Sequence, residues 1–176
     1  MSSPDYDFNK LFIATKGGPV VHGDRTLLLS DRIPAKLGER FLVTIISTSS
    51  EYPQGVGISD GVEVFGEHVR RAVVWEYFSL PPELRSSEKS RLPYTFEVTC
   101  SNKSGYLSFY NMAEVSGRQE WWHYASCMTA QNTATGRLYH CNDFQPNDDF
   151  IDLVFSVERI TKGEQADAGN RRSAGA

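Results

Sequence analysis

The sequence predicts one all-β domain, an antiparallel β-sandwich, because strand-like patterns recur along the chain and helical ones are rare. Apolar and polar residues alternate along Tyr94–Cys100 and along 151–158, as they do when successive side chains of a strand point to opposite faces. About ten short strands at regular spacing are typical of sandwiches. Jelly-roll, immunoglobulin-like and C2-like strand orders all suit this pattern, so the topology stays open.

The other expected strands are rich in β-branched and aromatic residues and are bounded by turn residues, as at 59–61 and 102–105. They cover 8–15, 26–30, 41–48, 62–65, 69–78, 106–115, 121–130 and 137–141. A short helix of one or two turns is expected within 82–88, and 55–57 is expected in a loop. The expected core residues are Val43, Ile45, Val73, Trp75, Phe96, Val98, Leu153 and Phe155.

The length of 176 residues fits a single domain with its own hydrophobic core. Beyond residue 162 the chain consists of Gly, Ala, Ser, Asn, Gln and charged residues without apolar periodicity. We therefore expect a folded domain over 1–162 and a disordered C-terminal tail over 163–176.

Charge and composition narrow the classes of partner. The formal net charge of −4 gives no overall attraction to phosphate backbones, so nucleic acid is excluded as the expected partner. No apolar stretch approaches the ~20 residues that a membrane span needs. The start of the chain lacks a signal-peptide pattern, and three cysteines are too few for a disulfide framework. We expect a cytoplasmic protein, or one exported without an N-terminal signal peptide.

An acidic segment near the C-terminal end could hold a cation. Calcium takes six to eight oxygen ligands, and this segment offers several within ten positions. The donors are Asp143, Asn147, Asp148, Asp149 and Asp152. The spacing is not that of an EF-hand. A calcium site is one interpretation, and an ordinary acidic turn followed by an amphipathic strand is the other.

The end of this segment, Asp-Asp-Phe-Ile-Asp-Leu-Val-Phe at 148–155, resembles an Asp-Phe-Asn-Asp-Leu-Val-Phe element of some bacterial surface-associated β-domains. Ile151 stands where that element has Asn. The resemblance covers fewer than a dozen residues and implies no function.

A second group of residues combines histidine and cysteine, the ligands that zinc prefers. It consists of His123, Cys127, His140 and Cys141. Adjacent His140 and Cys141 should point to opposite faces of a strand, so both cannot join one site. Core packing of the cysteines is the competing interpretation, and a Cys–His nucleophile pair is a third.

Aromatic residues cluster at 121–124. If this segment is a strand, Trp121 and Trp122 point to opposite faces, so at least one of them should be partly exposed. Together with Tyr124 and with Tyr106 on a nearby strand, it would form a platform for a sugar ring or a protein partner. Burial of the second Trp under a loop is the structural alternative.

No catalytic motif stands out: the sequence lacks a nucleophile elbow, a phosphate-binding loop, a dinucleotide fingerprint and a zinc-protease motif. We therefore predict a non-catalytic binding or assembly module that contacts a glycan or protein partner through this aromatic surface, with calcium as a candidate cofactor. Homo-oligomerisation is compatible with that role. The alternative is a hydrolase whose site is built from loop carboxylates or His and Cys residues.

Overall fold

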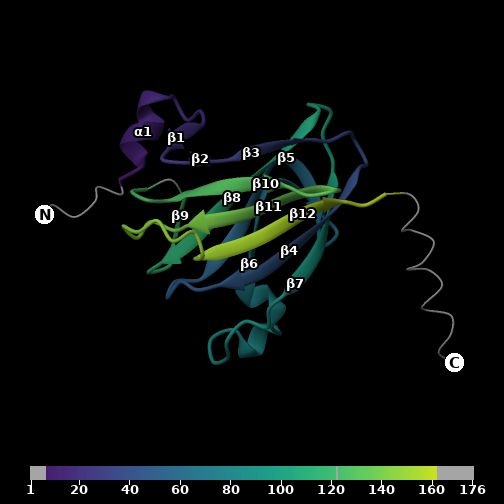
Figure 1. Ribbon diagram of the computed structural model, residues 1–176. Coiled ribbons are helices and arrows are strands. Elements are labelled where there is room, and N and C mark those ends of the chain that lie inside the picture. The colour runs from purple at the N-terminus through teal and green to yellow at the C-terminus, as the bar shows by residue number, and fades with distance from the viewer. Residues whose placement is uncertain (1–6, 122, 162–176) are drawn as a thin grey trace, which may run out of the picture.

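The computed structural model describes residues 7–121 and 123–161, and within them almost all regular structure is β-strand (Figure 1). A short helix, α1 (Asn9–Ala14), comes first, and two 3-10 turns, η1 (Glu76–Ser79) and η2 (Pro82–Leu84), follow β6. The strands are β1 (Val20–His22), β2 (Arg25–Leu27), β3 (Asp31–Pro34), β4 (Arg40–Thr48), β5 (Gln54–Val64), β6 (Glu67–Trp75), β7 (Tyr94–Cys100), β8 (Tyr106–Val115), β9 (Arg118–Glu120), β10 (Cys127–Asn132), β11 (Gly136–Asn142) and β12 (Leu153–Arg159).

Ten of the described strands form one antiparallel sheet, while β1 and β2 form a separate hairpin. The order is β10-β11-β12-β4-β7-β5-β8-β3, with β6 paired to β5 and β9 to β8. Leu28, just before β3, exchanges two backbone hydrogen bonds of 2.8 and 2.9 Å with Met128 in β10. Because these segments belong to opposite edges, the sheet is nearly closed and barrel-like. The predicted all-β antiparallel fold is confirmed.

The inner face of this sheet holds the main core. The predicted core residues that lie there are Val43, Ile45, Phe96, Val98, Leu153 and Phe155. Tyr139 in β11 stacks on Phe155 with ring centroids 4.5 Å apart. Val73 and Trp75 belong to a second core cluster on the other face of the sheet: Trp75 is buried there with Tyr110 and Met112, and Val73 packs against them. They lie on that face because Val74 between them points into the main core.

On the outer face, two glycines of β5 make room for aromatic rings. Val56 and Ile58 point inward, so Gly55 and Gly57 point outward. A Cβ on Gly57 would lie 2.1 Å from the Tyr110 ring, and one on Gly55 would lie 2.7 Å from the Trp75 ring. The expectation of a loop at 55–57 is therefore wrong, because these glycines allow the rings to lie against the strand.

A bulge interrupts β5 beyond these glycines. Ser59 pairs with Arg71 and Val62 with Val69, so β5 carries one extra residue relative to β6. Asp60 and Gly61 have φ angles of 87° and 98°, the left-handed region that Gly adopts readily. At this bulge β5 changes its neighbour from β8 to β7. Residues 59–61, which resemble a turn in sequence, therefore bend a continuing strand.

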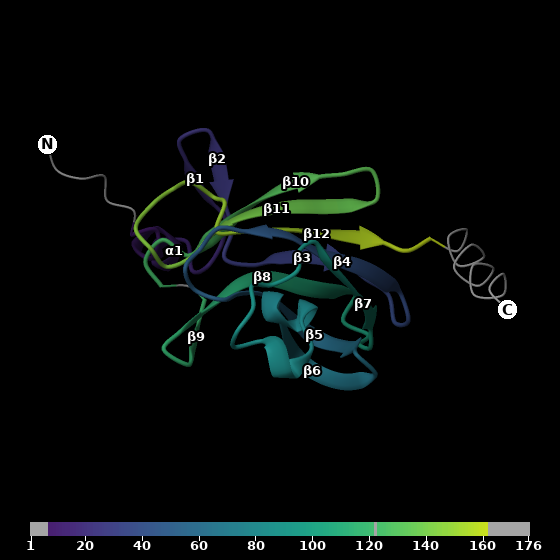
Figure 2. The same ribbon diagram turned by 90° about the horizontal axis from the view of Figure 1, so that it is seen from below.

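The N-terminal segment covers one end of the sheet, where α1 and the β1–β2 hairpin lie together in both views (Figure 2). The strand expected at 8–15 is wrong: Phe8 and Phe12, four residues apart, lie on one side of a helical turn and are buried against Leu27, Cys127 and Phe150. The strand expected at 121–130 is also corrected, because β10 begins only at Cys127.

The tail expected over 163–176 lies outside the described residues. Across the part of the chain that is described, no helix has the length and apolar character that a membrane crossing requires.

Candidate functional site

A small pocket lies on the outer face beside the β5 bulge, where β3, β5, β6 and β8 contribute side chains. We call it the aromatic pocket; its volume is about 190 Å³. The residues that matter below are Arg32, Asp60, Arg71, Ser108, Tyr110 and Trp121. They come from widely separated parts of the sequence, and the strand order brings them together.

One wall of the aromatic pocket is apolar. The rings of Trp121 and Tyr110 contact each other with centroids 5.1 Å apart and planes inclined by 51°. Trp121 is 38% exposed, whereas Tyr110 is nearly buried against Gly57. Burial raises the pKa of the Tyr110 phenol, so its hydroxyl stays protonated and is available as a hydrogen-bond donor. This wall can stack against one face of a ring.

The rest of the lining of this pocket is polar and charged. The Asp60 carboxylate accepts hydrogen bonds from the hydroxyls of Ser108 (2.5 Å) and Ser59 (3.3 Å). Arg71 is exposed and lies on the neighbouring strand β6, where its backbone pairs with Ser59, the residue before Asp60. Neither Arg71 nor Arg32 forms an ion pair with any described residue. The pocket thus combines hydroxyls, a carboxylate and two guanidinium groups.

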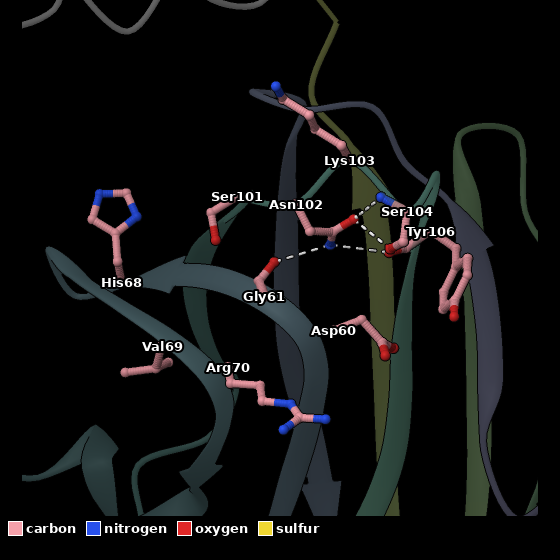
Figure 3. A pocket seen from close by; sticks show the side chains of 10 residues that line it. All are labelled: Asp60, Gly61, His68, Val69, Arg70, Ser101, Asn102, Lys103, Ser104 and Tyr106. Carbon is pink, nitrogen blue, oxygen red and sulfur yellow. Dashed lines mark hydrogen bonds between the residues drawn. The ribbon is translucent and has the colours of Figure 1, made fainter.

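A second, shallower pocket adjoins the first at Asp60 and is shown in Figure 3. We call it the turn pocket, because it includes the turn between β7 and β8; its volume is about 540 Å³. Its lining includes Gly61, Arg70, Asn102, Lys103 and Tyr106. The Arg32 guanidinium lies 4.5 Å from the centroid of the Tyr106 ring, which links the two pockets a second time.

Asn102 fixes the shape of the turn pocket. Its Nδ2 donates to the backbone oxygens of Gly61 (3.1 Å) and Tyr106 (3.2 Å), and its Oδ1 accepts from the backbone N–H of Ser104 (2.8 Å). Figure 3 shows these bonds between the bulge and the turn. The backbone around the pocket is therefore held before any ligand arrives.

The structure separates the three described residues that were predicted to bind a ligand. Trp121 lines the aromatic pocket and Tyr106 lines the turn pocket. Tyr124 is 61% exposed and lines neither of them. Trp122 lies outside the described residues. The charged partners Arg32, Asp60 and Arg71 were missed; the only local signal was the unusual Ser-Asp-Gly sequence at 59–61.

The acidic segment uses its buried carboxylates to hold its own loop. Asp143 Oδ2 accepts a hydrogen bond from Ser50 Oγ (2.6 Å), and its Oδ1 accepts one from the Gln145 backbone N–H (2.8 Å). Asp152 Oδ2 accepts from the Asp143 backbone N–H (2.9 Å). Burial raises the pKa of Asp152 to about 6, helped by the negative charges of Asp143 and Asp149.

The remaining proposed calcium ligands face outward or support the loop. Asp148 and Asp149 are exposed, and the backbone oxygen of Asn147 accepts a hydrogen bond from Asn142 Nδ2 (2.8 Å). Among the residues of known placement, no group of three or more His, Cys, Asp or Glu side chains could hold a metal ion. Calcium binding to this segment stays a prediction.

The cysteines near the histidines pack as core residues. Cys127 and Cys141 are buried, and burial raises the pKa of both thiols, so they stay protonated. The Cys127 thiol donates to the Ala125 backbone oxygen (3.3 Å), while His123 pairs with Glu120. This arrangement favours the packing interpretation over a zinc site or a cysteine nucleophile.

No protein-family model matches this sequence, and no curated protein matches it either.

Proposed function

We propose that this protein is a non-catalytic binding module whose aromatic pocket holds one sugar ring of a glycan. The observation that carries the proposal is that the Trp121–Tyr110 ring pair lines the same pocket as Asp60 and Arg71. A sugar ring has an apolar face of C–H groups and a rim of hydroxyls. The aromatic wall suits the face, and the carboxylate and guanidinium suit the rim.

The size of the pocket supports a small ligand. Its volume of about 190 Å³ is below the ~300–1,000 Å³ of pockets that enclose drug-sized molecules. A single ring fits such a space, and the rest of a glycan would extend out of it. Trp121 lines the pocket and is partly exposed, so its ring is accessible to the sugar.

The chemistry of the lining supports binding over hydrolysis. Glycosidases place two carboxyl groups on either side of the bond that they cleave. Among the described residues that line the aromatic pocket, Asp60 is the only carboxylate, and Ser59 and Ser108 already donate to it. A hydrolase with an unrecognised site is the alternative that turnover assays would reveal.

A glycan array probed with the parent protein tests this proposal. We expect retention of glycans that present a terminal ring, and competition by the corresponding monosaccharide. Absence of any retained glycan would reject the proposal, and a protein captured in its place would favour the assembly role. Turnover of generic glycoside or ester substrates would favour the hydrolase.

A further inference from the structure

We infer that the ligand is an anionic oligosaccharide of at least two sugar units that crosses Asp60 from the aromatic pocket into the turn pocket. This inference rests on the proposed function, since it extends the ligand beyond the ring bound at Trp121. It adds both the charge of the ligand and its minimum length.

The charge follows from the residues around the two pockets. Among their described lining residues, four carry a permanent positive charge, against the single carboxylate of Asp60. The four are Arg32, Arg70, Arg71 and Lys103. This local excess occurs on a protein of formal net charge −4, so it is a feature of this surface and not of the whole chain.

The arginines here differ from four arginines elsewhere that form ion pairs, although Arg25, Arg85 and Arg118 also form no ion pair with a described carboxylate. Four other arginines pair with carboxylates of the same chain: Arg40 with Glu97, Arg91 with Glu88, Arg137 with Asp31 and Arg159 with Glu39. The arginines of the two pockets have no such partner within the described chain. Guanidinium groups bind carboxylate and sulfate well because they present several N–H donors in one plane. These side chains are therefore available to an anionic ligand.

The length follows from the continuity of the pockets. Asp60 lines both, and the contact between Arg32 and Tyr106 joins them along β3 and β8. Figure 3 shows Arg70 and Lys103 coming from different elements, β6 and the β7–β8 turn, around the bulge. A ligand that contacts both Trp121 and these cations would occupy both pockets, which share Asp60. A single ring would leave the turn pocket unused.

The same surface is a poor match for nucleic acid. A nucleic-acid backbone extends far beyond two pockets and would meet the overall negative charge of the protein. A short saccharide with carboxylate or sulfate groups places its charge only where the cations are. Oligosaccharides carrying either group share this chemistry, and the test separates them.

Isothermal titration of the full chain with defined saccharides tests the inference. The probes are a uronic acid monosaccharide, its linear tetrasaccharide, a sulfated tetrasaccharide and a neutral tetrasaccharide. We expect at least one anionic tetrasaccharide to bind about tenfold more tightly than both the monosaccharide and the neutral tetrasaccharide. The preferred anionic form identifies the charged group, and its affinity should fall as salt is added.

A charge-neutralising variant locates the effect. Arg70→Gln combined with Lys103→Gln should remove the advantage of the tetrasaccharide and leave monosaccharide binding unchanged. The matched control, Lys16→Gln with Lys89→Gln, removes the same charge elsewhere and should keep that advantage. Both variants change exposed residues, so circular dichroism should show unchanged folds.

The outcomes separate the inference from the proposed function. Monosaccharide binding that gains nothing from length or charge would overturn the inference and leave the proposed function standing. An advantage that survives Arg70→Gln with Lys103→Gln would also overturn it. If no saccharide binds at all, both fail.

Discussion

The phenol of Tyr139 in β11 donates a hydrogen bond of 2.8 Å to the carboxylate of Asp31 in β3. These strands are not neighbours in the sheet order: β3 is the strand at one edge, and β11 is the second strand from the other edge, next to β10. Arg137 forms an ion pair with the same carboxylate. Together with the Leu28–Met128 bridge, these contacts hold the two edges of the sheet together.

Replacing this phenol should weaken the closure of the sheet. Tyr139→Phe keeps the ring that stacks on Phe155 but removes the hydrogen bond to a charged acceptor, so we expect a loss of about 1–3 kcal/mol in the free energy of unfolding. Urea denaturation measures it. Tyr124→Phe, at an exposed tyrosine, is the control and should change little. Equal stability of Tyr139→Phe and the parent would show that the bond does not hold the edges.

Asp152 should make stability depend on pH. Its folded pKa of about 6 lies above the ~3.9 of an unfolded Asp, so the folded state favours the protonated form. The contribution of Asp152 to the free energy of unfolding is therefore fully present at low pH. It falls by up to about 3 kcal/mol as pH rises from about 4 to 6.

Asp152→Asn cannot ionise and keeps an oxygen for the Asp143 N–H, so this loss should shrink. Chemical denaturation at several pH values measures it, with exposed Asp149→Asn as the control. A variant whose stability falls between pH 4 and 6 as steeply as that of the parent would contradict the role of Asp152.

Gly57 should be required because of the ring above it. An alanine Cβ would lie 2.1 Å from the Tyr110 ring, so Gly57→Ala should displace that ring and cost about 1–3 kcal/mol. In a Tyr110→Ala background the ring is absent, so Gly57→Ala should lower the free energy of unfolding much less than it does in the parent protein. A double-mutant cycle from thermal or urea unfolding measures this coupling. Simple additivity would mean that the ring does not determine the glycine.

The calcium hypothesis predicts a higher melting temperature in millimolar calcium than in chelator. Binding at a hundredfold excess over the dissociation constant would stabilise the fold by about 2.7 kcal/mol. The shift should disappear in Asp148→Ala and in Asp149→Ala. An unchanged melting temperature of the parent protein rejects a site at 143–152, and a shift that survives both substitutions places the cation elsewhere.

Alternation predicted the strands that have one buried face. The strand Tyr94–Cys100 was identified with its exact bounds, because its apolar residues fall at every second position. The segment 8–15 was predicted to be a strand because aromatic and β-branched residues favour strands, whereas the spacing of Phe8 and Phe12 suits a helical turn equally well. Residues 55–57 were predicted to form a loop because glycine usually marks one. The role of these glycines beneath aromatic rings depends on strands far away in sequence.

The candidate site was only partly visible in the sequence. Trp121 was identified because it belongs to an aromatic cluster, but its neighbours Arg32 and Arg71 come from strands whose adjacency depends on the strand order. Asp60 was assigned to a turn because bulges and turns use the same residue types. The sequence therefore indicates an aromatic surface, but the position of the charged residues beside it depends on the strand order, which the sequence alone does not give.

The most direct test of the proposed sugar site compares two exposed aromatic residues of the same segment. Trp121 lines the aromatic pocket and Tyr124 does not. The glycan that binds best on the array is titrated by calorimetry into the parent, Trp121→Ala and Tyr124→Ala, after circular dichroism has confirmed that all three are folded. We predict that Trp121→Ala weakens binding about tenfold and that Tyr124→Ala leaves it unchanged. Undiminished affinity of Trp121→Ala would contradict the assignment of this pocket as the binding site.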